Sequence, residues 1–154
     1  MAGIEQKLSA MNLEIPEAAT PLGNYVGYTV AGNTVYVSGQ LPLRDGVVAV
    51  TGQLGAGVSV EQGYEAGRIC AINLIAQLRA ACGGDLNRVV KVLRLGGFVN
   101  VAPGFVDAPK CINGASDLFV ELFGDKGRHA RFAVGVASLP AGAAVEIDGT
   151  FEIS

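Results

Sequence analysis

The pattern of apolar and polar positions begins with helical spacing and then changes to strand-like segments. Apolar residues recur three to four positions apart over Ile4–Met11, which predicts a short first helix. Tyr25–Val30 and Thr34–Ser38 are rich in β-branched and aromatic residues, which favour strands. The turn residues Gly32-Asn33 separate the two segments, so we expect a β-hairpin.

Two longer segments have the apolar spacing of amphipathic helices. Ser59, with Gln62 three positions on, is a capping-box signature, and the helical pattern that follows it ends at Gly83-Gly84. A second long helix is predicted over Phe105–Phe123, ended by Gly124. The residues expected to point inward from this second helix are Ile112, Ala115, Leu118, Phe119 and Leu122.

Glycines inside the predicted elements indicate close contacts. Gly63 and Gly67 lie within the first long helix, where each costs up to about 1 kcal/mol relative to alanine. We therefore expect that helix to pack closely on a sheet. Gly96-Gly97, within a strand, predicts a bulge or a close backbone contact.

Three more strands complete the pattern, with a glycine- and proline-containing loop over Gln40–Gly57 before the first long helix. The strands are predicted at Val89–Val101, Arg131–Ala137 and Ala144–Ile153. The order after the leading helix is then β-β-α-β-α-β-β. This order predicts an α+β fold in one domain over residues 1–154, with a mixed sheet and both long helices on one face.

The sheet face without helices is the reason to expect an oligomer. Helices on one face cannot cover every apolar side chain of the last two strands, and a bare apolar face is normally buried against another subunit. The apolar residues in question include Val134, Val136, Val145 and Ile147. The mean hydropathy of +0.40 agrees with this expectation.

Composition and charge exclude several classes of protein. Hydrophobic residues make up 50% of the chain and charged residues 16%, which is typical of a compact core and opposite to disorder. The net charge is −3, the pI is near 5.1, and no three basic residues are consecutive. Binding to nucleic acid or to an anionic membrane is therefore not expected.

The cysteines and the N-terminus also limit the possibilities. Cys70, Cys82 and Cys111 are odd in number and form no C-x-x-C pair, so neither a disulfide framework nor a zinc site is expected. Cys70 falls in a helical pattern and is predicted to be a small buried residue. With no signal-peptide pattern and no apolar stretch of about 18 residues, we expect a cytoplasmic protein.

Few side chains suggest chemistry, and Arg131 is the foremost. It opens an apolar strand, so its guanidinium needs either a structural ion pair or a bound carboxylate, to which it can donate two parallel hydrogen bonds. Glu146 and Asp148, two apart on a strand, share one face, either as surface charges or as groups that hold a water molecule. The single histidine, His129, is expected to be structural or solvated, because no partner for a nucleophilic triad or a metal cluster is evident.

Several short motifs occur in an order that resembles the Rid/YjgF family, also labelled endoribonuclease L-PSP-like. The motifs are Gly23-Asn24-Tyr25, Ser38-Gly39-Gln40-Leu41-Pro42, Asn113, Ala130-Arg131, Leu139-Pro140 and Val145-Glu146-Ile147. The resemblance runs from about Tyr25 to the C-terminus. The longer N-terminus and the Asn113–Asp117 stretch resemble a longer branch of this family.

The resemblance implies a chorismate-mutase-like fold, a homotrimer and ligand clefts between neighbouring subunits. It also implies hydrolysis of 2-imino acids to 2-keto acids and ammonia, with no metal and no cofactor. Arg131 falls on the family's essential arginine, which clamps the substrate carboxylate with help from the N–H of Gly39, and Glu146 falls on the glutamate that handles water. The other pocket positions implied are Tyr25, Ser38, Asn113 and Ala133.

This chain departs from the family pattern beside the arginine, which leaves the size of the substrate open. Ala133 stands where the best-known deaminases often have cysteine, Phe132 is bulkier than the expected serine, and Asp148 replaces a glutamate. Two other functions are weighed. A non-catalytic module that binds small carboxylates would also need Arg131, whereas a ribonuclease is disfavoured by the acidic pI.

Overall fold

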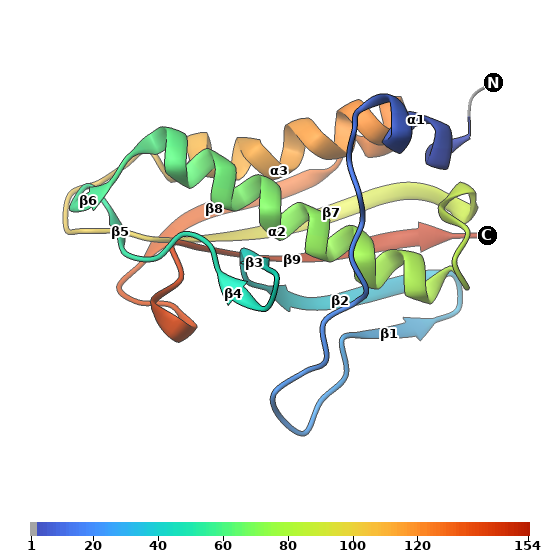
Figure 1. Ribbon diagram of the computed structural model, residues 1–154, viewed down its shortest axis with the longest axis horizontal. Helices are drawn as coiled ribbons and strands as arrows, with labels where there is room; N and C mark the ends of the chain where they lie inside the picture. The colour runs from blue at the N-terminus through green and yellow to red at the C-terminus, as the bar shows by residue number, and fades with distance from the viewer. Residues whose placement is uncertain (1–2) are drawn as a thin grey trace.

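A computed structural model describes residues 3–154 as a five-stranded mixed sheet with two long helices across one face (Figure 1). The strand order in the sheet is β1-β2-β9-β7-β8. The helices and strands are α1 (Ile4–Ala10), β1 (Tyr28–Ala31), β2 (Thr34–Gln40), β3 (Leu43–Arg44), β4 (Val47–Val48), β5 (Gln53–Leu54), β6 (Gly57–Val58), α2 (Val60–Ala81), β7 (Val89–Asn100), α3 (Ala108–Phe123), β8 (Ala130–Val136) and β9 (Val145–Ile153).

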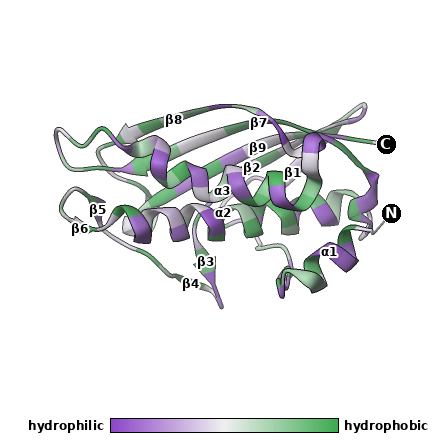
Figure 2. Cartoon of the chain, turned by 90° about the horizontal axis from the view of Figure 1, so that it is seen from above, coloured by the Kyte–Doolittle hydropathy of each residue, from purple (hydrophilic) through white to green (hydrophobic). Residues whose placement is uncertain are grey.

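The predicted α+β class and element order are confirmed. β7 and β8 run parallel and are joined through α3, while β1–β2, β2–β9 and β7–β9 pair antiparallel. Seen from the side, α2 and α3 both lie below the sheet, and no helix covers its upper face (Figure 2). None of the helices within residues 3–154 combines the length and the apolar character that a membrane span requires.

The element boundaries differ from the prediction in three places. The second long helix, α3, begins at Ala108 and not at Phe105, because Pro109 is tolerated in the first turn of a helix and not in its interior. The first strand begins at Tyr28, so Tyr25 and Val26 lie in the preceding loop. The segment predicted as a loop over Gln40–Gly57 contains two small ladders, antiparallel β3–β4 and parallel β5–β6. Strands of two residues carry too short a pattern to be recognised in a sequence.

The ends of the long helices follow the local sequence signals. Ser59 Oγ accepts a hydrogen bond from the N–H of Gln62 at 3.1 Å, and Gln62 Oε1 accepts one from the N–H of Ser59 at 2.9 Å. This reciprocal pair is the predicted capping box, and it satisfies two N–H groups that a helix start leaves free. α3 ends at Gly124, whose φ of 64° is accessible to glycine with little strain.

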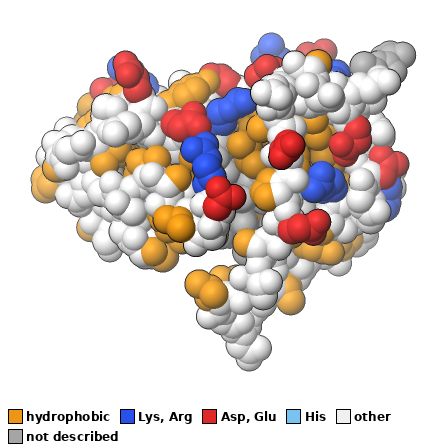
Figure 3. Space-filling view, in the orientation of Figure 1, with side chains coloured by type: hydrophobic (Ala, Val, Ile, Leu, Met, Phe, Trp, Pro, Cys, Tyr) orange, Lys and Arg blue, Asp and Glu red, His pale blue; other side chains and the backbone are white. Residues whose placement is uncertain are grey.

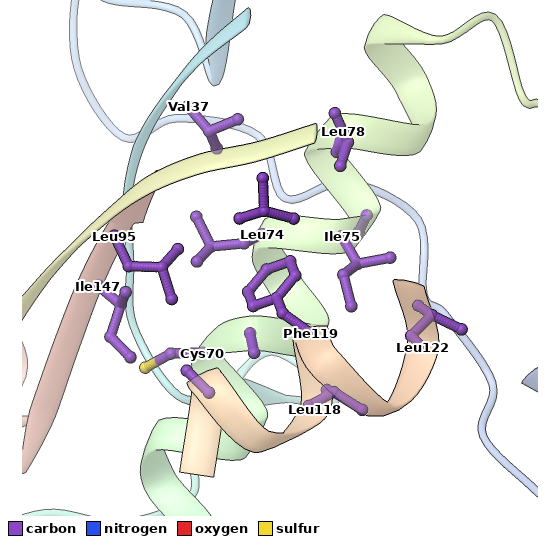
Figure 4. Close-up of a cluster of buried hydrophobic side chains, with 14 of the residues drawn as sticks. Val37, Cys70, Leu74, Ile75, Leu78, Leu95, Leu118, Phe119, Leu122 and Ile147 are labelled. Atoms are coloured by element: carbon purple, nitrogen blue, oxygen red, sulfur yellow. The ribbon is translucent and has the colours of Figure 1, made fainter. Parts of the chain in front are cut away.

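The core lies between the two helices and the covered face of the sheet. Leu74 and Leu78 of α2 and Phe119 of α3 point toward Leu95 and Ile147 of the central strands, and all five are fully buried (Figure 4). The five inward residues predicted for the second long helix are buried as well. Cys70 is fully buried in the same cluster, as its place in the helical pattern predicted.

The glycines of α2 face α3 and not the sheet, so the predicted helix–sheet contact is wrong. A Cβ on Gly67 would collide with the carbonyl oxygen of Cys111, and a Cβ on Gly63 would collide with the same residue's Sγ. From the other side, a Cβ on Gly114 would collide with the carbonyl oxygen of Tyr64. These glycines therefore let the two helix backbones approach closely. Gly97 does make a close contact, since a Cβ there would collide with Ile112 of α3.

The uncovered sheet face is more polar than the sequence pattern suggested. In β9 burial alternates strictly, and the side chains of Val145 and Ile147 are fully buried on the face that the helices cover. The expectation that the two helices cannot cover these residues is therefore wrong. The alternate β9 side chains, which lie on the uncovered face, are Glu146, Asp148, Thr150 and Glu152. Val134 of β8 is exposed on this face, as expected. The face is therefore mixed in polarity.

Candidate functional site

Arg131 lies on β8, the strand at one edge of the sheet, and points toward α3. Its Cα is paired with that of Leu95, a fully buried core residue, so the two side chains lie on the helix-covered face. Nη1 of Arg131 donates a hydrogen bond to Oγ of Ser116 in α3 at 3.0 Å. Within residues 3–154 the guanidinium forms no ion pair with a carboxylate.

Ser116 and His129 extend this contact into a small network, which we call the arginine cluster (Ser116, His129 and Arg131). Nε2 of His129 lies 2.8 Å from Oγ of Ser116, and Nδ1 lies 2.6 Å from the carbonyl oxygen of Gly127. Burial of the imidazole lowers the pKa of His129; the bond to Gly127 opposes the shift, and the charges of Arg131 and Lys91 add to it. The net shift favours the neutral imidazole.

Asn113 and Ala133 flank the arginine cluster. Asn113 precedes Ser116 by three positions in α3, which places the two residues on the same side of the helix. Ala133 follows Arg131 by two positions in β8, on the same face, and its Cα is paired with that of Gly97. All these side chains are half-buried. The structure thus places Arg131 and Ala133 on one face of β8, and Asn113 on the side of α3 that carries Ser116, the hydrogen-bond partner of Arg131.

A second group of predicted residues is built on an irregularity in β2. The pairing of β2 with β9 shifts between Val37 and Gln40, so Ser38 and Gly39 together stand opposite one residue, Asp148. Such a bulge redirects side chains at the edge of a site. Ser38 Oγ donates to the carbonyl oxygen of Val26 at 2.7 Å, and this bond ties the loop before β1 to the bulge.

Glu146 lies against the bulge. A Cβ on Gly39 would collide with Glu146 Oε2, so the carboxylate occupies the space that only glycine leaves free. Burial raises the pKa of Glu146, and the nearby negative charge of Asp148 raises it further. A carboxylate with a raised pKa is suited to accept a proton from water.

Tyr25 belongs to the same end of the molecule as Ser38 and Gly39. The three residues line one pocket of about 90 Å³. The segment that carries Tyr25 projects from the body of the molecule (Figures 1 and 3), with Leu22 fully exposed and Tyr25 59% exposed. Glu146 does not line this pocket and is linked to it through its contact with Gly39. We call the four residues Tyr25, Ser38, Gly39 and Glu146 together the glutamate pocket.

The arginine cluster and the glutamate pocket do not meet within one chain. Glu146 is paired with Phe98 on the uncovered face of the sheet, whereas Arg131 is paired with Leu95 on the covered face. β7 also lies between their two strands, which places β8 and β9 about 10 Å apart. Within one chain the predicted site residues therefore form two separate halves.

Phe132 does not crowd the arginine cluster, although the sequence suggested that it would affect the size of the substrate. Its ring lies on the opposite face from Arg131, edge-on to Phe98 with 5.2 Å between the ring centroids. The guanidinium carbon of Arg94 lies 4.9 Å from the centre of the same ring. Strand alternation explains the difference, because adjacent residues point to opposite faces.

Comparison with known proteins identifies the family. Residues 5–146 match the family model described as "YjgF/chorismate_mutase-like, putative endoribonuclease", which is most of the chain. The chain belongs to the YjgF family. The resemblance drawn from the ordered motifs is therefore confirmed, and with it the chorismate-mutase-like fold.

Similar YjgF-family proteins match along nearly their whole length. Protein TCP17 of Trypanosoma cruzi is 47% identical over 152 residues, with 98% of this chain and 94% of TCP17 covered. The Agrobacterium tumefaciens protein Atu1372, solved as a protein of unknown function, is 48% identical with a TM-score of 0.92, covering 98% of this chain and 92% of that one. A Shewanella oneidensis protein that carries the endoribonuclease description is 39% identical with a TM-score of 0.94, covering 99% and 100%.

Reasoning from the sequence did not anticipate the hydrogen bonds that join His129 to Ser116 and Ser116 to Arg131. The interpretation of His129 as structural or solvated did not anticipate that it bonds to a residue that holds Arg131. One signal was present: His129 precedes Arg131, the first residue of a predicted strand, by two positions, so the two side chains share a face if the extended backbone begins at His129. Ser116 has no such signal, because its contact depends on how α3 lies over β8.

Proposed function

We propose that this protein hydrolyses 2-imino acids, and their enamine tautomers, to 2-keto acids and ammonia. The observation that carries the proposal is the half-buried guanidinium of Arg131, held at a sheet edge by Ser116 and free of any carboxylate within residues 3–154. An arginine in this state can donate two parallel hydrogen bonds to a substrate carboxylate.

The proposed site lies between two copies of the chain. One copy supplies the arginine cluster with Asn113 and Ala133, and its neighbour supplies the glutamate pocket. The separation of the two halves on opposite sheet faces supports this arrangement. A homotrimer, in which each chain meets two neighbours, would form three such sites.

The proposed reaction needs positioning more than a strong nucleophile. Arg131 and the N–H of Gly39 hold the carboxylate, and Glu146 removes a proton from water as the water oxygen bonds to the imino carbon. Glu146 passes that proton to the nitrogen, and it then takes the remaining proton from the hydroxyl group of the tetrahedral intermediate as the carbon–oxygen double bond forms. The carbon–nitrogen bond breaks, and the nitrogen leaves as ammonia that has received both protons of the water. The raised pKa of Glu146 suits both steps.

The test is turnover of 2-iminopropionate made in place by an amino-acid oxidase, with semicarbazide trapping to report the imine that remains. Wild-type protein should speed loss of the imine. Charge-assisted hydrogen bonds contribute roughly 1.5–3 kcal/mol each, so Arg131→Lys should lower kcat/KM at least about a hundredfold, and Arg131→Ala should abolish turnover. Lysine keeps the charge but cannot form the two-pronged contact.

A matched control separates catalysis from folding. Arg128→Ala removes an arginine three positions away whose side chain is 73% exposed, and it should leave turnover unchanged. Thermal midpoint and oligomer mass are measured on the same preparations. Unchanged turnover in well-folded Arg131→Ala would refute the clamp. A folded wild type that accelerates none of several imino acids would leave the non-catalytic carboxylate-binding module as the better account.

A further inference from the structure

The hydrogen bonds of the arginine cluster fix where its protons lie. The carbonyl oxygen of Gly127 can only accept, so Nδ1 of His129, at 2.6 Å, carries the proton. In the neutral ring Nε2 is then an acceptor, and the Ser116 hydroxyl donates to it across 2.8 Å. With its proton directed to the imidazole, Ser116 Oγ presents a lone pair to Nη1 of Arg131 at 3.0 Å.

We propose that His129 and Ser116 are positioning residues for Arg131: the imidazole sets the direction of the Ser116 hydroxyl, and the hydroxyl oxygen holds the guanidinium in the orientation that receives a carboxylate. This proposal rests on the proposed function of Arg131 as the carboxylate clamp. One Nη1–H is used by Ser116, and four N–H groups of the guanidinium remain for a ligand.

The network is anchored in tightly packed backbone. A Cβ on Gly127 would collide with the carbonyl oxygen of Phe119, so Gly127 lies directly against α3 and the position of its carbonyl group is fixed. The ring of Phe119 packs against the imidazole, with 6.3 Å between centroids and an interplanar angle of 71°. His129 is therefore restrained by α3 on one side and by the Gly127 carbonyl group on the other.

The hydroxyl group of Ser116 has different hydrogen-bond partners from those of most serines inside helices. Such a serine usually bonds to the carbonyl group four residues earlier or points to solvent. Within residues 3–154, the hydroxyl of Ser116 contacts His129 and Arg131 and makes no such bond to its own helix. The hydroxyl group thus links the helix to the edge strand at the position of the proposed clamp.

The first measurement needs neither ligand nor turnover. The chain has one histidine, so the ring ¹⁵N signals of His129 are assigned without ambiguity. At neutral pH, Nδ1 should be protonated and Nε2 bare, and the Arg131 Nε–H should show restricted motion in ¹⁵N relaxation that Ser116→Ala abolishes. A ring protonated at Nε2, or an Arg131 side chain whose motion Ser116→Ala leaves unchanged, would overturn the proposal.

The second measurement uses turnover of 2-iminopropionate. Ser116→Ala should raise KM about tenfold with kcat within about twofold, because the lost hydrogen bond positions the clamp and takes no part in the chemical step. Ser9→Ala, an exposed helical serine, is the control and should change neither.

A pair of substitutions at His129 distinguishes positioning from packing. The side-chain oxygen of His129→Gln reaches about as far as Nε2 and can still accept from Ser116, so KM should stay near the wild-type value. His129→Asn is shorter and should behave like Ser116→Ala. Equal KM values for the two variants, with thermal midpoints that fall alike, would show a purely structural role. If the wild type lacks turnover altogether, the proposed function fails, and the ring tautomer and the motion of Arg131 still decide this inference.

Discussion

At the scale of single residues, Gly39 and Glu146 show why the glutamate pocket has its shape. Because Gly39 has no Cβ, the carboxylate of Glu146 has room beside it. The bulge in β2 includes Gly39 and brings its backbone next to that carboxylate. The carboxylate is held where burial and Asp148 both disfavour its charge. Structures keep a carboxylate in such surroundings mainly at functional sites.

The pH dependence of turnover tests this reading of Glu146. Because the proposed base acts as the carboxylate, kcat/KM should fall as pH drops through the pKa of Glu146, which lies above its ordinary value of 4.5. Asp148→Asn removes a neighbouring negative charge with little change of shape, so the pKa of Glu146 should fall and the acid limb should move to lower pH. The measurement is kcat/KM from about pH 4 to about pH 8, taken as the ratio of variant to wild type with one substrate.

The ratio cancels the titration of the imine itself. Glu146→Gln should show no acid limb and little turnover, since the amide cannot accept the proton. An acid limb that stays in place in folded Asp148→Asn would contradict the account, because that residue is the second cause of the raised pKa.

At the scale of elements, the contact between α2 and α3 positions the helix residue that Arg131 bonds to, Ser116. Gly67 and Gly114 remove side chains from both sides of this contact, which brings the helix backbones together. Ser116 and Asn113 lie within two residues of Gly114 in α3. The distance between α3 and the sheet therefore determines where these two side chains lie relative to β8.

Gly114→Ala should therefore destabilise the fold. Alanine gains up to about 1 kcal/mol in helix propensity, but its Cβ would strike the Tyr64 carbonyl oxygen and the Arg68 nitrogen, which belong to backbone and cannot turn aside. Overpacking of this kind costs typically about 1–3 kcal/mol, occasionally more, so the net effect is a loss. Thermal unfolding should show a lower midpoint, while the exposed α3 change Glu121→Ala should stay within about 0.5 kcal/mol of wild type. A midpoint raised by Gly114→Ala would show that propensity outweighs the collision.

The sequence predicted those features that depend on neighbours along the chain. The capping box at Ser59 and the glycine end of α3 at Gly124 are local signals, and both are confirmed. The face that Val145 presents, the packing partner of Gly67 and the bond from His129 to Ser116 depend on how distant elements meet. The sequence of β9 showed that apolar and polar side chains alternate. It did not show which of the two sets faces the helices.

The candidate site also combines features that the sequence predicted with features that depend on how distant strands pair. Arg131, Asn113 and Ala133 lie where α3 meets β8, and Tyr25, Ser38 and Gly39 line one pocket. Both groupings follow the ordered family motifs. That Arg131 and Glu146 lie on opposite faces of the sheet could not be read from residue types. It follows from the register of β8 and β9 against β7.

At the scale of the whole molecule, the central claim is that one chain supplies the arginine and another supplies the glutamate. The projecting segment with Leu22 and Tyr25 (Figure 3), together with the uncovered sheet face (Figure 2), offers surface for such an assembly. Light scattering on the wild type should give the mass of three chains. A mass near one chain at every dilution would exclude the assembly.

The most direct test mixes two inactive variants. Arg131→Ala retains the glutamate pocket, and Glu146→Gln retains the arginine cluster, so each should assemble and show almost no turnover alone. Co-expressed in equal amounts, they should form mixed oligomers in which about one quarter of the sites draw an intact arginine from one chain and an intact glutamate from another, and turnover should recover to about that fraction of wild type. Mixed oligomers of the correct mass that show no more turnover than the separate variants would contradict the shared site.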